Sequence, residues 1–130
     1  MVHNIFEIKK VAVQEEEIKE FTSEKDFLGL SIDILIEVGS FVCVAANLYT
    51  IDRKEWNRDE AILGGHLVRL YKLVSAMLDQ TTQLRRETTH IFSRLAFECI
   101  INLRYLIKHA STELFNSYVE RSLRHERKLR

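Results

Sequence analysis

The sequence predicts an all-α protein folded as an antiparallel bundle of four main helices plus an N-terminal segment. The 130 residues include no proline and only 4 glycines, while 46% are hydrophobic and 29% are charged. This composition favours helices over turn-rich β folds. Apolar residues also recur at helical spacing along most of the chain. The length predicts a single domain over residues 1–130, and the unterminated pattern at its end indicates a fragment of a longer protein.

The first two expected elements occupy residues 4–21 and about 23–49. The N-terminal segment mixes apolar residues with the acidic run Glu15–Glu17, and we expect its second half to be helical. Ser23, with Asp26 three residues later, has the capping-box pattern that starts a helix. That helix is strongly apolar as far as Tyr49, so we expect it to lie in the core.

Three further helices are expected in the second half of the chain. Asn57 and Glu60 repeat the capping-box pattern before a helix with one apolar face, which ends near residues 79–82. The next helix, residues 82–109, is apolar on several sides and is therefore expected at the centre of the bundle. Ser111 can cap a last amphipathic helix. The connecting loops are short, which predicts antiparallel neighbours.

A polar series runs through the apolar helix at residues 82–109. Arg94, Glu98 and Asn102 are spaced four residues apart, so their side chains lie on one face of the helix. Buried charges must be paired, and Asp33 and Glu37 on the first long helix could supply a counter-charge to Arg94. We interpret the five residues as a buried polar network that sets helix packing. The alternative is the lining of an anion-binding site.

Residues 93–108, SRLAFECIINLRYLIK, resemble the signature of a bacterial family of uncharacterised helical proteins. In that family an Arg-x-x-x-Glu pair is followed by an Asn-Leu-x-Tyr-Leu stretch and by an aromatic segment similar to residues 114–118. The family-like positions here are Arg94, Glu98, Asn102, Tyr105 and Tyr118. The resemblance covers roughly residues 58–130 and implies a helical fold without an established activity.

A catalytic alternative depends on Arg104 and His109. Their Arg-x4-His spacing is similar to that of a class of helical, metal-independent ribonucleases, the HEPN group, and Arg85 and His90 repeat it. Such a His can act as general acid or base while the Arg stabilises phosphate charge. Five residues place two side chains about 140° apart around a regular helix. The pair could therefore converge only near a helix end or across a dimer interface.

The sequence predicts no metal site and no cofactor. Glu87 and His90 form a single Glu-x-x-His motif, whereas di-iron bundles need two copies and two further glutamates. Gly64 and Gly65 lie inside a helical pattern and lack the Gly-Lys-Ser/Thr of a phosphate-binding loop.

Charge is divided unevenly between the two halves of this neutral chain. Residues 1–60 contain 13 acidic and 7 basic residues, a net charge of −6, and residues 61–130 contain 6 acidic and 12 basic residues, a net charge of +6. The halves can attract each other within or between subunits, or the basic half can meet an anion. Arg121, Arg124, Arg127 and Lys128 are candidate phosphate contacts near the C-terminus, and they leave nucleic-acid binding open.

We expect a cytoplasmic protein that does not enter a membrane. The N-terminus lacks the basic start and apolar run of a signal peptide. The apolar stretch from Leu28 to Ile51 is interrupted by Asp33, Glu37 and Asn47, which favours a soluble core helix over a membrane span.

No complete catalytic constellation accompanies these patterns. We therefore expect a non-enzymatic helical module of an uncharacterised bacterial protein, acting by self-association into a homo-oligomer or by binding a protein partner. The alternative is a HEPN-like ribonuclease that uses Arg104 and His109 at a dimer interface.

Overall fold

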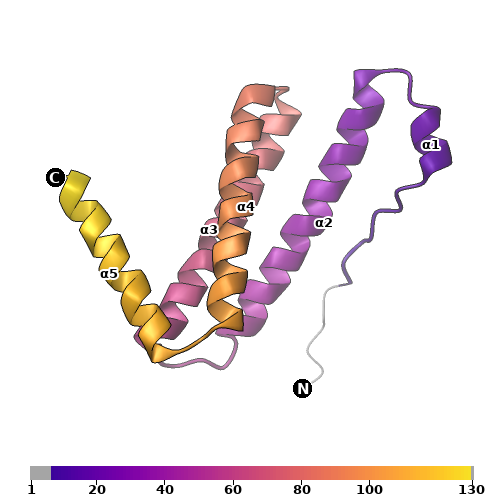
Figure 1. The fold of residues 1–130 in the computed structure, drawn as a ribbon. Coiled ribbons are helices and arrows are strands. Elements are labelled where there is room, and N and C mark those ends of the chain that lie inside the picture. Colours follow the sequence, from indigo (N-terminus) through magenta and orange to yellow (C-terminus); the bar gives the residue numbers. More distant parts are fainter. Residues whose placement is uncertain (1–6, 130) are drawn as a thin grey trace.

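The computed structural model describes residues 7–129, and within that range it contains five α-helices and no β-strand (Figure 1). The helices are α1 (Glu15–Lys19), α2 (Glu24–Thr50), α3 (Arg58–Thr82), α4 (Arg86–Lys108) and α5 (Thr112–Leu129). The all-α class is confirmed, and each of the four long helices lies where the sequence predicts it. The expected N-terminal helix is α1, which lies in the second half of residues 4–21 as predicted, and residues 4–6 of that segment lie outside the described residues.

Both predicted capping boxes are present. The backbone N–H groups of Ser23 and Thr22 donate to the Asp26 carboxylate over 3.0 Å and 3.1 Å, and these bonds hold the pKa of Asp26 below its usual value. Before α3, the Glu60 N–H donates to Asn57 Oδ1 over 2.8 Å, and the Asn57 N–H donates to the Glu60 carboxylate over 3.1 Å. These local bonds explain why the start of both helices could be predicted.

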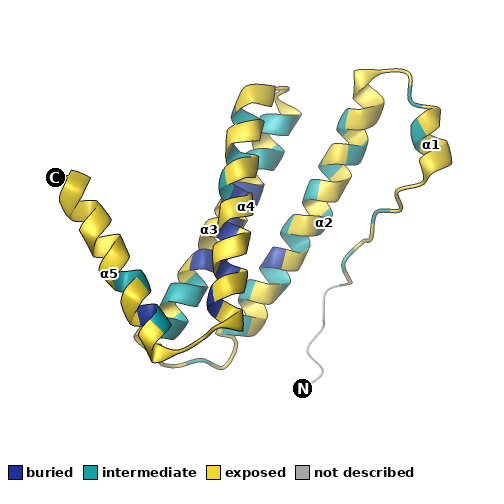
Figure 2. Ribbon diagram, in the orientation of Figure 1, coloured by how far each residue is buried: buried dark blue, intermediate teal, exposed yellow. Residues whose placement is uncertain are grey.

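The central helix is α3, because both α2 and α4 pack against it. The expectation that residues 82–109 form the centre is wrong. α4 directs one apolar face at α3 and exposes others, so being apolar on several sides did not make it central. The buried cluster lies where the three helices meet, with most of its residues in α3 and α4 (Figure 2). Its members are Val42, Leu70, Leu73, Val74, Ala96 and Cys99.

An aromatic corner joins the end of α2 to the start of α3. The hydroxyl of Tyr49 donates to the backbone carbonyl of Glu60 over 3.1 Å. The Arg53 guanidinium lies 4.6 Å from the Tyr49 ring centre and 5.1 Å from the Trp56 ring centre. Arg53 also forms an ion pair with Glu60 and lowers the pKa of that carboxyl. The Trp56 ring lies over Gly64, where a Cβ would come within 3.0 Å of it.

The N-terminal segment runs beside α2 and covers part of it (Figure 1). The backbone N–H of Val11 donates to Glu37 Oε2 over 2.7 Å, a contact that fixes the segment to the middle of α2.

α5 leaves the bundle instead of completing it. Phe115, in its first turn, is only 3% exposed, but every described residue from Glu120 onward is exposed. The helix then diverges from α4 (Figure 1). Only α2, α3 and α4 therefore lie side by side, and the position of the fourth helix of a regular bundle is open between α2 and α4.

Candidate functional site: an open apolar face on α2 and α4

A row of exposed residues follows one side of α2. Its spacing alternates between four and three residues, which is the period of a helix that packs lengthwise against another helix. All of its members are exposed, although most are apolar: Phe27, Ser31, Ile34, Val38, Phe41, Ala45 and Leu48.

α4 carries a second row with the same alternating spacing. Ser93, Phe97, Ile100 and Ile107 belong to it, Arg104 interrupts it, and all five residues are exposed. α2 and α4 flank the same helix, α3, and run in the same direction (Figure 1). An ion pair between Glu24 and Arg86 links the starts of the two rows. We call the two rows together the open face.

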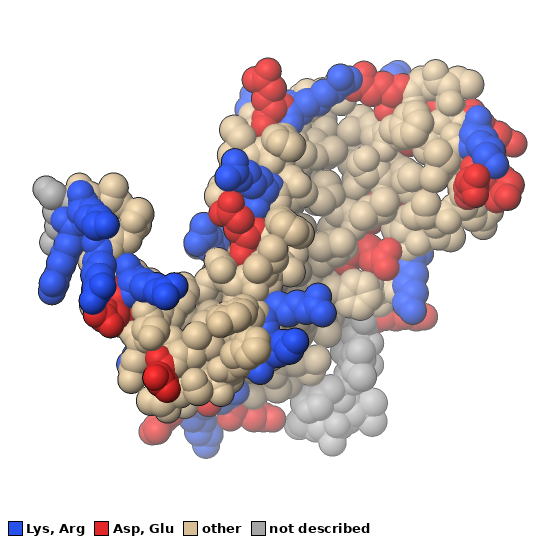
Figure 3. All heavy atoms as spheres, in the orientation of Figure 1, with Lys and Arg blue, Asp and Glu red and all other residues tan. Residues whose placement is uncertain are grey.

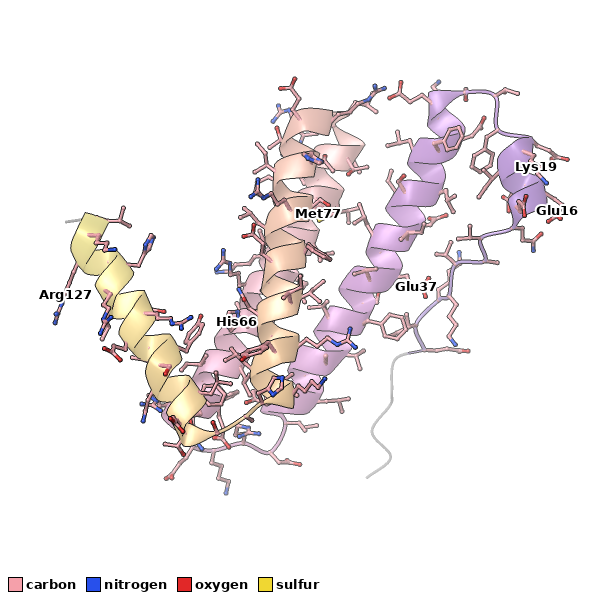
Figure 4. All side chains as sticks on the ribbon, in the orientation of Figure 1. Glu16, Lys19, Glu37, His66, Met77 and Arg127 are labelled. Atoms are coloured by element: carbon pink, nitrogen blue, oxygen red, sulfur yellow. The ribbon has the colours of Figure 1, made fainter. Side chains whose placement is uncertain are left out.

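The open face ends in a cavity at the starts of α2 and α4. The cavity has a volume of about 410 Å³, and its lining includes Phe27 and Ser31 from α2, Met77 from α3, and Ser93 from α4. Met77 is labelled in Figure 4. The cavity shows that α2 and α4 are separated at this end, so the open face is hollowed here.

The apolar area of the open face is large for a monomer. Its eight large apolar side chains are between 38% and 66% exposed. With roughly 200 Å² for a large side chain, they expose on the order of 800 Å². The largest apolar patch of a typical monomer covers about 300–600 Å². This surface is comparable to the roughly 800 Å² that each partner buries in a standard protein interface.

The prediction of a buried polar network is wrong. Its five residues are Arg94, Glu98, Asn102, Asp33 and Glu37. Arg94 Nε donates to Glu98 Oε1 over 3.2 Å, but the two side chains are 78% and 53% exposed. Asn102 and Asp33 are exposed as well. Glu37 bonds to the backbone of Val11. The polar series faces solvent because α4 meets α3 through another side, where Ala96, Cys99, Leu103 and Leu106 are buried.

The structure does not bring Arg104 and His109 together. Both are exposed, and their five-residue separation places them on different sides of the end of α4. The His109 ring instead packs against the Tyr105 ring, with 4.7 Å between the ring centres. Arg85 and His90 both line the cavity at the other end of α4. Ribonuclease activity therefore stays a prediction, and this geometry adds no support for Arg104 and His109.

The four predicted anion contacts lie on α5. Arg121, Arg124, Arg127 and Lys128 are all exposed, and Arg124 forms an ion pair with Glu120. Basic side chains gather on α5 in the space-filling view (Figure 3). Arg121, Arg124 and Lys128 are spaced to share the side of α5 opposite to Phe115. Nucleic-acid binding through these residues stays a prediction.

Sequence reasoning missed a buried polar junction between α3, α4 and α5. His66 is 6% exposed, and its Nε2 lies 3.0 Å from the hydroxyl of Tyr118. Its Nδ1 lies 3.8 Å from the sulfur of Cys99, whose thiol donates to the His66 backbone carbonyl over 3.4 Å. His66 falls on the apolar face of α3 between Leu63 and Leu70, a spacing that could have revealed its burial.

The junction is suited to holding helices together rather than to catalysis. Burial, with a smaller contribution from the charge of Arg69, lowers the pKa of His66 and favours its neutral form. Burial raises the pKa of the Cys99 thiol, which keeps it protonated and makes it a poor nucleophile. Across residues 7–129, no group of three His, Cys, Asp or Glu side chains is placed to hold a metal ion.

Two helices are long and apolar enough to cross a membrane by length and composition. Their best windows have mean hydropathies of 2.0 for α2 and 1.3 for α3, and 6% and 22% of these windows are buried. A core helix of a soluble protein passes the same test when it is mostly buried, but α2 is not, so the expectation that α2 lies in the core is wrong. The expected cytoplasmic location stays a prediction.

These features define an all-α helical domain with its core in α3, α4 and the start of α5. Residues 60–130 match the model of a family described as Family of unknown function (DUF5677). The match covers more than half of the chain, so the chain belongs to this family. It confirms the resemblance to uncharacterised helical proteins seen in the sequence. No curated protein and no solved structure matches the chain.

Proposed function

We propose that this chain is a non-enzymatic helical module that acts by self-association, with the open face as the contact between two copies. The observation that carries the proposal is the exposed apolar area of two rows with helix-packing period, Phe27 to Leu48 on α2 and Ser93 to Ile107 on α4. Leaving this area in water is unfavourable, and burying it against a second copy removes that cost.

A second copy fits the open face better than a membrane that α2 would cross. The open face is hollowed at one end, where the helix of another protein can insert side chains. If α2 crossed a membrane, Asp33 and Glu37 would have to enter it, at a cost of about 2.5–3.5 kcal/mol for a charged side chain at the centre of a bilayer. The contact between two copies leaves both carboxylates at its edge, since neither belongs to the α2 row.

The proposal is tested by sedimentation equilibrium of the whole chain and of Phe41→Glu, which places a charge in the middle of the open face. We expect the unmodified protein to form dimers at micromolar concentrations and Phe41→Glu to be monomeric, with unchanged helical circular dichroism. Tyr105→Glu is the matched control, because Tyr105 is a similarly exposed aromatic residue outside the two rows. This control should still dimerise.

Two results would overturn the proposal. One is an unmodified protein that stays monomeric up to millimolar concentration. The other is a protein that floats with neutral phosphatidylcholine vesicles in a density gradient and loses this binding in Phe41→Glu, which would assign the open face to a membrane.

A further inference from the structure

The two sides of the molecule carry opposite charge. Residues 15–26, which form α1 and the start of α2, include six acidic and two basic residues, a net charge of −4. Residues 120–129 of α5 include two acidic and four basic residues, a net charge of +2. Figure 3 shows basic side chains on α5 at one side of the molecule and an acidic group on α1 at the other. The labelled side chains of Glu16 and Arg127 mark the two sides (Figure 4).

Part of this charge takes no part in an ion pair within the described chain, namely Glu16, Glu17 and Glu20 on the acidic side and Arg121, Arg127 and Lys128 on α5. Within α1, Glu15 pairs with Lys19, and within α5, Arg124 pairs with Glu120. Glu24 pairs with Arg86 of α4. α1 and α5 are separated by the three central helices, so they do not neutralise each other (Figure 1). A second copy can bring the two charges together.

We infer that the two copies pair about a two-fold axis parallel to α2 and α4, so that α5 of each copy lies against α1 and the start of α2 of the other. This inference rests on the proposed function, because it presumes that the open faces meet. A contact between identical faces needs a two-fold axis, which can run along the helices or across them. The charges distinguish these two arrangements.

Rotation by 180° about an axis along the helices places the α5 side of one copy opposite the α1 side of the other. The helices of the two copies then run in the same direction. In Figure 1, α5 and α1 lie on opposite sides of α4 and α2, and both point toward the end where α2 begins. This rotation therefore places the basic α5 of one copy opposite the acidic α1 of its partner, twice per dimer. An axis across the helices reverses the ends but keeps the sides, so α5 meets α5 and α1 meets α1. The second arrangement opposes like charges.

The charged contacts orient the dimer, while the open face supplies most of its stability. Exposed ion pairs each contribute little and are screened by salt. Two symmetric sets of such pairs can change the dimerisation constant by about tenfold. We therefore expect the dimer to weaken several-fold between about 50 mM and 500 mM NaCl. The arrangement with like charges opposed would instead strengthen with salt.

The test reverses the charge of α5, neutralises the acidic side, and then combines the two changes, in the full chain. Arg121→Glu with Lys128→Glu changes residues 120–129 from +2 to −2 and leaves the Arg124–Glu120 pair in place. Glu16→Lys with Glu17→Lys changes residues 15–26 from −4 to 0. We expect the α5 variant to dimerise about tenfold more weakly than the unmodified chain, because it opposes negative charge to the acidic side, and the Glu16→Lys, Glu17→Lys variant to be weakened by a smaller factor. The variant carrying all four changes should dimerise more strongly than the α5 variant, because it removes this repulsion.

Lys54→Glu with Lys72→Glu is the matched control, because it changes the net charge as much as the α5 variant does at exposed positions away from both sides. It should dimerise like the unmodified chain. The inference is overturned if the α5 variant dimerises as well as the unmodified chain, or if the variant carrying all four changes dimerises no more strongly than the α5 variant. Phe41→Glu distinguishes a wrong orientation from a wrong proposed function. If Phe41→Glu abolishes a dimer that the charge changes leave intact, only the orientation is wrong. If the unmodified chain forms no dimer at all, the proposed function is wrong.

Discussion

The segment that matches the family forms most of the core, whereas α2, the helix that precedes it, is largely exposed. Of the buried residues in the described part of the chain, all but Val42 lie between His66 and Phe115, inside the family segment. α2 has the higher mean hydropathy of the two most apolar helices, yet only 6% of its best window is buried. The difference shows that an apolar helix can be an outer layer that presents a face. The core is instead built by α3 and α4, whose apolar residues meet each other.

Truncation of a core side chain should give the largest effect on monomer stability. Leu70 is 6% exposed and belongs to the buried cluster. We expect Leu70→Ala to lower the free energy of unfolding by about 2–5 kcal/mol, through lost burial and a residual cavity. Leu48→Ala removes the same atoms from a residue of α2 that is 66% exposed, and it should cost less than about 0.5 kcal/mol in the monomer. Urea unfolding of both variants at low protein concentration measures the difference, and equal losses would contradict the comparison.

The attachment of α5 should be the next most sensitive feature. Tyr118→Phe removes the hydroxyl that lies 3.0 Å from His66 Nε2 and leaves that buried nitrogen without its partner. A loss of about 1–3 kcal/mol is expected for an unsatisfied buried polar group. Hydrogen exchange of α5 should accelerate while that of α2 stays unchanged. Tyr105→Phe, at an exposed position on α4, is the control. If both variants behave alike, the junction does not hold α5.

The same junction predicts a pH dependence of stability. Burial lowers the pKa of His66 in the folded protein, so the folded state binds this proton less readily than the unfolded state does. The contribution of His66 is therefore fully present above its unfolded pKa of about 6.5 and is progressively lost as the pH falls below that value.

This dependence can be assigned by substitution. Between pH 7.5 and pH 5, the melting temperature should decrease less for His66→Asn than for the unmodified chain. His90→Asn, at an exposed position of α4, should keep the full decrease. A steeper decrease in His66→Asn would contradict the assignment.

Two adjacent glycines of α3, Gly64 and Gly65, should respond differently to substitution by alanine, because only Gly64 lies against the α2–α3 corner. A Cβ on Gly65 would meet no atom within 4 Å, so Gly65→Ala should stabilise the helix by about 0.5–1 kcal/mol. A Cβ on Gly64 would lie 3.0 Å from Trp56, whose ring packs 5.5 Å from the Tyr49 ring. Gly64→Ala should therefore lose this gain or become destabilising by up to about 1 kcal/mol. Melting temperatures give the sign, and the tryptophan emission should shift only in Gly64→Ala.

Local sequence signals made the helices predictable, but the face that each helix buries could not be predicted from them. The pairs Ser23–Asp26 and Asn57–Glu60 act within four residues, so their patterns identify the start of a helix without knowledge of the fold. The side of a helix that meets a neighbour depends on residues far away in sequence. α4 has apolar residues on several sides, and its periodicity alone could not show that Cys99 faces α3 while Phe97 and Ile101 face solvent.

The departure of α5 had the same cause. Short loops predict a regular antiparallel bundle, but the direction of α5 is set by the burial of Phe115 and by the contact of Tyr118 with His66. That contact joins residues 52 positions apart in the sequence. The open face was hidden for the same reason, since its two rows become neighbours only when α2 and α4 pack on α3.

The Arg94–Glu98 pair gives the smallest expected effect and distinguishes the sequence interpretation from the structure. A buried ion pair would cost about 3–5 kcal/mol when one partner is removed. The observed side chains are 78% and 53% exposed, and an exposed pair at this helical spacing contributes only about 0.3–0.5 kcal/mol. Arg94→Ala and Glu98→Ala should therefore each change the free energy of unfolding by no more than about 0.5 kcal/mol. A loss of several kcal/mol at micromolar concentration that vanishes on dilution would mean that a second copy covers this side of α4 as well, which would extend the contact surface beyond the open face.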